Sequence, residues 1–437
     1  MGMPMREGTM QRVTIVGGAG DMGRVVARDL VARRRTIELV LADRDVAKAE
    51  RVAAAFGVPG VRVLPVDVFD PDRLREVVRG SALVVNATGP YFRTGPPVLE
   101  ACLDERAAYL DLGDDFEAAD VLLAFDRAAR AVGVTALVCA GLTPGLWNVL
   151  VRLLVDRLEQ VERIALAWVT GSTPKRPGVE RGGRAVLEHM LHEASGMTVT
   201  VRDGRRRLLP AFRRAATIRF PAPLGPMRVY DLGHSELATF PRSFAGVREV
   251  RTLGGLQPPV LNGVFQGIAA AVVAGRLEWD EAVDGLLALD SGDAALRSRA
   301  TREALRGVAR QCLRRDVSLS EALALLRGGG GPTAAPAGAL FARVEGRRDG
   351  RPCALECIEV AGGTDAEAAM DELTGGAAAL FVEAFLDGDV RGPGVVAPEQ
   401  ALAPERFLRR IRTVFPDLTL AVHEVAPGSV WGSSTAG

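Results

Sequence analysis

Residues 13–23 read VTIVGGAGDMG, a short apolar run followed by a glycine-rich turn and the start of a helical pattern. Gly18, Gly20 and Gly23 have the G-x-G-x-x-G spacing, which between a strand and a helix is typical of a dinucleotide-binding loop. We expect Gly18 to permit the tight turn, Gly20 to let a pyrophosphate approach the backbone, and Gly23 to let the helix pack closely on the strand. The stretch therefore predicts a dinucleotide site.

Five further residues are candidates for the same site. Asp21 and Met22 begin the helix after the loop, where backbone amides favour an anion. Asp43 ends the next apolar run and is the expected ribose-binding acid; its charge repels a 2′-phosphate and so favours NAD. Arg44 follows it and can turn toward a phosphate, so NADP stays open. Asp67, after the third run, is either an adenine-edge contact or a helix N-cap.

The first third of the chain alternates apolar runs with amphipathic helical stretches. Runs that are apolar on both faces and separated by helices predict a doubly wound parallel sheet, and thus an α/β fold class. Its ligand is expected at the carboxyl ends of the strands. The runs are RVTIV (12–16), ELVLA (38–42), VRVLPV (61–66), ALVVN (82–86), AYLDL (108–112) and TALVCA (135–140).

The loop VVNATGPYFRTGPPVLEAC (84–102) follows the fourth run. In a doubly wound sheet it lies across the crevice from the glycine loop, close to a nicotinamide. We therefore add its first residues to the cofactor candidates and expect Tyr91 and, after the next strand, Asp114 to border the nicotinamide. The added cofactor candidates are Asn86, Ala87, Thr88 and Gly89.

Composition excludes several classes of partner. Lys plus Arg and Asp plus Glu number 54 each, which gives no electrostatic reason to expect nucleic acid. No run of about 18 apolar residues occurs, so we expect no membrane partner, and the first residues lack a signal-peptide core. Five scattered cysteines indicate neither a disulfide framework nor a zinc site. We expect a cytoplasmic protein that binds a small molecule.

Taken together, these motifs resemble the saccharopine dehydrogenase family, in particular its glutamate-forming, saccharopine reductase-like branch. The resemblance implies a Rossmann domain and an NAD(P)-dependent oxidoreductase that joins an amino group to an aldehyde or oxoacid carbon through an imine. It also implies a homodimer. Thr143 stands where relatives commonly carry Asp. The motifs are GGAGDMG (17–23), NATGPYFRTGPPVLEAC (86–102), AYLDLGDD (108–115), AGLTPG (140–145) and GPGVVAPEQALAPERFLRRI (392–411).

The remaining residues predict an α+β substrate or dimerisation domain over 146–389, with a helical segment at 262–330. Its strand patterns suggest a mostly antiparallel sheet with hairpins at Asp203-Gly204 and Asp349-Gly350. Residues 390–425 are expected to return to the first domain (1–145), as the resemblance implies. We expect a disordered tail at 426–437 and a solvated or substrate-closing loop at 173–184.

Catalytic candidates in the second domain are few. His234 leaves a strand for a loop, where it is either a proton donor or an ordinary polar residue. Arg242 stands where the resembling family places a carboxylate-binding arginine; the alternative is an ordinary surface arginine. His189 and His192 share one helical face without an evident third ligand, so we predict no metal. His423 is expected to be structural.

Two other functions remain open. Some relatives in the resembling family are trans-acting enoyl reductases of lipid or polyketide assembly, which use the same cofactor on another acceptor. The alternative of a different class is a non-catalytic NAD(P)-binding sensor, which needs the glycine loop but neither His234 nor Arg242.

Overall fold

A computed structural model describes residues 10–34, 36–171, 184–291, 298–326, 337–362, 370–415, 420–426, 428 and 431. The chain forms two compact units. Unit 1 comprises residues 1–150 and 370–416, and unit 2 comprises residues 151–369 and 417–437. Within the described residues, no helix is both long and apolar enough to cross a membrane.

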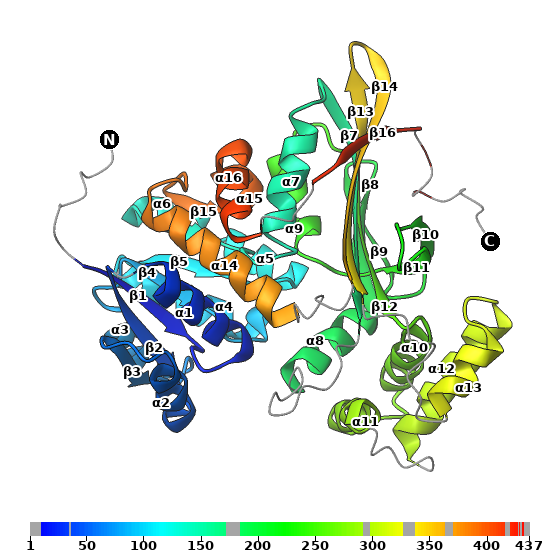
Figure 1. Ribbon diagram of the computed structural model, residues 1–437, viewed down its shortest axis with the longest axis horizontal. Coiled ribbons are helices and arrows are strands. Elements are labelled where there is room, and N and C mark those ends of the chain that lie inside the picture. The colour runs from blue at the N-terminus through cyan, green and yellow to red at the C-terminus, as the bar shows by residue number, and fades with distance from the viewer. Residues whose placement is uncertain are drawn as a thin grey trace. The chain divides into compact units, whose positions relative to one another are not determined.

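Unit 1 is built on a seven-stranded sheet in the order β15-β6-β5-β4-β1-β2-β3, all of whose pairings are parallel (Figure 1). Apolar residues such as Ile15, Leu41 and Val84 are fully buried, as expected for strands with helices on both faces. The doubly wound α/β prediction is confirmed. The strands are β1 (Gln11–Val16), β2 (Ile37–Asp43), β3 (Val61–Pro65), β4 (Leu83–Asn86), β5 (Ala108–Asp111), β6 (Thr135–Leu137) and β15 (Gly394–Val396).

The helices of unit 1 include one from late in the sequence that the sequence analysis assigned to the second domain. Helix α14 packs on α1, and a Cβ at Gly375 would lie only 2.6 Å from Val25 Cβ, so glycine permits this close approach. The helices are α1 (Asp21–Arg33), α2 (Val46–Ala55), α3 (Pro71–Val78), α4 (Tyr91–Asp104), α5 (Phe116–Leu123), α6 (Asp126–Val132), α7 (Leu146–Val155), which crosses the unit boundary, α14 (Met370–Leu386), α15 (Pro398–Ala401) and α16 (Pro404–Val414).

Unit 2 contains a nine-stranded, mostly antiparallel sheet, in which β12 and β7 are the parallel neighbours. Its main path runs β10-β11-β12-β7-β13-β14-β16, and β8 joins β12 to β9. The strands are β7 (Gln160–Gly171), β8 (Met197–Arg202), β9 (Arg205–Pro210), β10 (Ala215–Arg219), β11 (Pro226–Asp231), β12 (Glu249–Gln257), β13 (Ala337–Arg348), β14 (Arg351–Gly362) and β16 (Val422–Val425).

Both predicted hairpins are present. Asp203-Gly204 joins β8 to β9 and Asp349-Gly350 joins β13 to β14, and all four residues have positive φ, as a tight two-residue hairpin turn requires. One cluster of apolar side chains lies among the helices of the predicted helical segment and the sheet. The helices of unit 2 are α8 (Arg184–Ala194), α9 (Glu236–Ser243), α10 (Val260–Val273), α11 (Trp279–Ser291), α12 (Arg299–Leu313) and α13 (Leu319–Leu326).

The C-terminal segment differs from the expectation in two places. Strand β16 pairs with β14 in unit 2, so the prediction that all of 390–425 returns to the first domain is wrong beyond α16. Trp431 is buried in an apolar cluster and lies 4.1 Å below the Arg163 guanidinium, so a disordered tail is wrong at that residue. Most of the remaining predicted tail, and the predicted loop 173–184 except its last residue, lie outside the described residues.

Candidate functional site

The strand order of unit 1 creates a switch point between β1 and β4. From β1 the chain winds outward through β2 to β3, and β4 then lies on the other side of β1. At such a point the loops leaving the two strands separate and form a crevice at the carboxyl ends. The glycine loop leaves β1 here, and the Ala87 amide, just after β4, donates to Val16 O at 2.8 Å. The two predicted cofactor loops are therefore neighbours.

The first glycines of the loop have roles that differ from the sequence prediction. Gly17 has φ +79°, whereas Gly18 is outside the positive-φ region, so Gly17 makes the left-handed turn. A Cβ at Gly17 would also lie 2.7 Å from Thr88 Cγ2. Gly18 instead packs on β2, where an added Cβ would lie 3.0 Å from Leu41 Cβ. The assignment of the tight turn to Gly18 was thus one residue too late.

Gly20 and Gly23 have the environments that their predicted roles require. A Cβ on Gly20 would meet Gly17 O in a tight contact at 3.2 Å, with Ala87 O next at 4.0 Å, so glycine keeps the backbone free of a side chain here. A Cβ on Gly23 would lie 2.2 Å from Gly17 O, so only glycine allows α1 to approach this closely. Helix α1 has no side-chain cap, whereas Asp45 caps α2. A backbone without a side chain and uncapped amides fit a pyrophosphate group.

Asp43 is held at the end of β2 by the glycine loop itself. Its Oδ2 accepts from the Ala19 amide at 2.9 Å and its Oδ1 from the Asp45 amide at 3.0 Å. A carboxylate has about four acceptor positions, so this leaves capacity for ribose hydroxyls. Arg44 beside it is exposed.

Asp67 is exposed after β3, and its Oδ1 accepts from the Phe69 amide at 2.9 Å. The N-cap of α3 is Asp70, which accepts from the Arg73 amide. The alternative that Asp67 caps this helix is therefore wrong, because the helix begins three residues later than that interpretation requires.

The loop after β4 is fixed by a buried side chain. Asn86 is fully buried, and its Oδ1 accepts from the Thr88 amide at 3.1 Å and the Thr88 hydroxyl at 2.5 Å. Its Nδ2 donates to the Tyr109 hydroxyl at 3.3 Å. The Thr94 hydroxyl donates to Thr88 O, so α4 is tied to the same turn. Gly89, after this turn, is exposed. The Asn86 amide thus sets the path of the predicted cofactor loop.

Asp111, the last residue of β5, is a buried carboxyl group that the sequence analysis did not select. Its Oδ1 accepts from the Gly113 amide at 2.9 Å and the Cys139 amide at 2.8 Å. Burial raises its pKa to about 6, against the opposing effect of these amides and of the Tyr109 hydroxyl. As the final residue of an apolar strand it gave no motif signal. It joins the ends of β5 and β6 beside the Asn86 loop.

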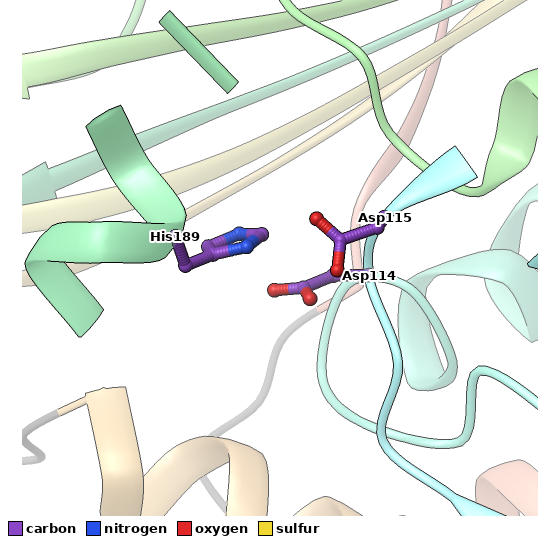
Figure 2. Close-up of side chains that lie close together, drawn as sticks. All are labelled: Asp114, Asp115 and His189. Carbon is purple, nitrogen blue, oxygen red and sulfur yellow. The ribbon is translucent and has the colours of Figure 1, made fainter. Parts of the chain in front are cut away.

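Tyr91 and Asp114 approach each other at the same edge of the sheet. Tyr91 begins α4, and a Cβ on Gly113 would lie 3.3 Å from the Tyr91 Cβ. Burial, and then the negative charge of Asp114, raise the pKa of the Tyr91 phenol, so it stays protonated and able to donate. Asp114 and Asp115 lie on the segment after β5 (Figure 2); Asp114 is half-buried and Asp115 buried.

In unit 2, His234 follows β11 and is paired with a carboxylate that the sequence analysis missed. His234 Nδ1 lies 2.5 Å from Glu236 Oε2, and both side chains are buried. Arg242, in the last turn of α9, is exposed. His189, on α8 (Figure 2), has Nε2 at 3.4 Å from Glu193 Oε2, one helical turn away. His423 is exposed on β16.

Comparison with known proteins agrees with this geometry. Residues 13–137 match the family model described as the saccharopine dehydrogenase NADP binding domain. Carboxyaminopropylagmatine dehydrogenase of Synechocystis sp. is 32% identical over 149 residues, covering 32% of this chain and 36% of that protein. Carboxynorspermidine synthase of Vibrio cholerae is 23% identical over 267 residues, covering 56% and 63%. The chain thus matches less than two thirds of the length of these relatives.

A shorter match is to the trans-acting enoyl reductase of Mycobacterium leprae, 29% identical over 103 residues and covering 24% of that protein. Among solved structures, apo saccharopine dehydrogenase (L-Glu forming) from Saccharomyces cerevisiae has a TM-score of 0.61 at 17% identity. The match covers 95% of this chain and 100% of that one. This match shows the fold of both units.

The fold and the glycine loop define a dinucleotide-binding Rossmann domain in unit 1. Residues 13–137 match the NADP binding domain of the saccharopine dehydrogenase family, and the fold of the chain is similar to that of a saccharopine dehydrogenase. The resemblance stated from the sequence is confirmed.

Proposed function

We propose that this protein is an NAD(P)-dependent oxidoreductase acting on a CH–NH group. It transfers hydride between the nicotinamide and an imine carbon, and the imine forms from an amino acid and an aldehyde or oxoacid. The observation that carries the proposal is the side-chain-free backbone at Gly20 and the uncapped start of α1, beside the loop that Asn86 fixes. The bound nicotinamide supplies or accepts the hydride.

The residues of unit 1 have separate tasks in this proposal. The amides at the start of α1 bind the pyrophosphate, and Asp43 binds the ribose and favours NAD. The Asn86 loop bounds the nicotinamide. The protonated Tyr91 donates a hydrogen bond near the reacting carbon, and Asp114 favours a positively charged amine or iminium there by its charge.

Unit 2 supplies the remaining groups. His234 exchanges a proton with the substrate, and Arg242 binds a substrate carboxylate by its planar guanidinium. Support for an amine substrate comes from the two relatives whose names denote a carboxyaminopropylagmatine and a carboxynorspermidine. A small amino-acid-derived molecule as substrate and a homodimer as the assembly are parts of the same proposal.

A second candidate is enoyl reduction, favoured by the match to the Mycobacterium leprae protein. It uses the same cofactor site but needs neither an imine nor a carboxylate-binding arginine. The amine substrate is preferred because the two relatives with amine-containing names match more of the chain than the enoyl reductase does.

The test uses the full chain with NADH and NADPH in turn. Primary amines and amino acids are offered in pairs with aldehydes and oxoacids, and nicotinamide oxidation is followed by absorbance. The proposal expects a secondary-amine product that carries deuterium from 4-deuterated cofactor, detected by mass spectrometry. Reduction of enoyl thioesters without any amine product favours the second candidate. Tight cofactor binding without turnover of any substrate favours the non-catalytic sensor.

A further inference from the structure

The start of helix α9 in unit 2 contains an unusual set of buried polar side chains. His234, Ser235, Glu236 and Thr239 are exposed by only 4%, 0%, 0% and 1%, although they lie within six consecutive residues. Polar groups are buried at a cost of a few kcal/mol each unless they find partners. Four of them in little more than one helical turn therefore need a reason other than packing.

Two of these side chains lack the partners that burial demands. Within the described part of the chain, neither Ser235 Oγ nor Thr239 Oγ1 has a hydrogen-bond partner. Ser235 occupies the N-cap position of α9, yet its hydroxyl does not cap the helix. Both hydroxyls, four residues apart on one face, are left available for a polar ligand. The apolar side chains of the same helix, Leu237 and Phe240, are also buried.

The other two side chains form a close pair. His234 Nδ1 is 2.5 Å from Glu236 Oε2, a contact that needs a proton between the two atoms. In the tautomer with the proton on Nδ1, the ring donates to Glu236, and Nε2 is then the ring atom that can exchange a proton with a substrate. A carboxylate that orients an imidazole in this way also stabilises its protonated form. The pair thus has the arrangement of a proton-transfer dyad.

We propose that Glu236 is a positioning residue that holds His234 as the proton carrier of the reaction, with the Ser235 and Thr239 hydroxyls binding the polar part of the substrate. The inference rests on the proposed function and assigns its acid–base group. The sequence left two roles open for His234, a proton donor and an ordinary polar residue, and the inference selects the first.

In the direction of amine synthesis, the amine and the carbonyl compound first give a carbinolamine. Protonated His234 gives its Nε2 proton to the carbinolamine hydroxyl, the C–O bond breaks, and water leaves. The nitrogen lone pair forms the C=N bond of an iminium ion, and the imidazole regains a proton from solvent. A bound reduced nicotinamide would supply the hydride that reduces the iminium carbon and would itself be oxidised.

The first measurement does not depend on activity. The chain has four histidines, so selective 15N labelling of histidine gives few signals. The His234→Gln protein assigns the His234 signals, and His423→Gln, which removes an exposed histidine of the same unit, is the matched control. We expect the proton on Nδ1 of His234 in the unaltered protein. In Glu236→Gln, the tautomer with the proton on Nε2 should gain population.

The second measurement is steady-state kinetics with the pair of substrates found for the unaltered protein. Glu236→Gln should lower kcat by about 10²-fold, the usual scale of acid–base catalysis, with KM for the carbonyl substrate changed by less than about threefold. Glu236→Asp, which keeps the charge, should recover part of the loss. His423→Gln should retain its activity. A purely structural Glu236 would instead change kcat in step with thermal stability, without rescue by Asp.

Two results overturn the inference. One is a His234 signal with the proton on Nε2 in the unaltered protein, and this result does not depend on any Glu236 variant. The other is a folded Glu236→Gln protein with activity within about twofold of the unaltered protein, because acid–base catalysis contributes far more than that. Failure of the proposed function gives a different result, because the unaltered protein then turns over no amine and carbonyl pair. In that case the 15N signals still show whether Glu236 holds the proton on Nδ1 of His234.

Discussion

The N-terminal ends of α1 in unit 1 and α9 in unit 2 both lack a side-chain cap, but they prepare for ligands in opposite ways. At the start of α1 the side chains are absent or do not cap the helix: Gly20 has none, and the backbone amides are left uncapped. At α9 the chain concentrates side chains, with a buried histidine, a carboxylate and two hydroxyls. The first suits an anion that must touch the backbone, and the second suits proton exchange.

The largest expected effect tests the backbone site. Gly20→Val should raise the dissociation constant for the dinucleotide by at least about 10³-fold, which is about 4 kcal/mol, because its methyl groups occupy the place of the pyrophosphate. The variant should fold, because Gly20 has a φ of −69° and Gly17 O, 3.2 Å from the added Cβ, needs to shift by only a few tenths of an ångström. Calorimetric titration with NADH and NADPH measures the loss.

Gly23→Ala provides the contrast within the same loop. Its Cβ would lie 2.2 Å from Gly17 O, so it should lower the melting temperature as well as the affinity. If Gly20→Val binds dinucleotide as tightly as the unaltered protein, the cofactor does not lie at this loop.

The second prediction concerns Asp111, the last residue of β5. The pKa of Asp111 is higher in the folded protein than in the unfolded chain, so its contribution to the free energy of unfolding is fully present at low pH. That contribution is lost as the pH rises through about 6. Asp111→Asn keeps an oxygen for the Gly113 and Cys139 amides but carries no charge. Its free energy of unfolding, relative to the unaltered protein, should therefore rise by about 2.4 kcal/mol between pH 4 and pH 7.

Urea unfolding at pH 4, 5.5 and 7 measures this difference. Asp72→Asn, on the exposed start of α3 in the same unit, should show no comparable dependence on pH. A difference between Asp111→Asn and the unaltered protein that stays constant across the range would show that Asp111 titrates as an ordinary surface carboxylate.

The two helix starts also show what the sequence could predict. The glycine loop was predictable because each glycine is dictated by local backbone geometry, although the left-handed turn falls on Gly17 and not on Gly18. Glu236 and Asp111 were not, because the burial of a carboxylate depends on tertiary packing that the local sequence does not show. A histidine followed two residues later by Glu was the available signal for Glu236.

The third prediction tests whether Arg242 binds substrate in unit 2. Arg242→Ala should lower kcat/KM by about 10²-fold, or about 2.7 kcal/mol, without changing the affinity for the dinucleotide. Arg242→Lys should recover only part, because a point charge cannot reproduce the planar guanidinium. Arg248→Ala, another exposed arginine of the same segment, is the matched control. Equal effects of Arg242→Ala and Arg248→Ala would make Arg242 an ordinary surface residue.

The smallest expected effect concerns Asp43, and the structure changes how it must be measured. Asp43 accepts from the Ala19 and Asp45 amides, so Asp43→Ala also loosens the glycine loop and weakens both cofactors. The informative quantity is the ratio of the two dissociation constants, because the loss of loop order is common to both. Removing the charge takes away a ribose acceptor for NADH and the repulsion of the 2′-phosphate for NADPH.

The ratio should therefore move toward NADPH by about tenfold, or about 1.4 kcal/mol. Asp72→Ala, remote from the glycine loop in sequence and exposed on α3, should leave it unchanged. If both dissociation constants rise by the same factor in Asp43→Ala, Asp43 serves only as a brace for the loop. Another residue would then determine the preference between NAD and NADP, and the exposed Arg44 would be the next one to replace.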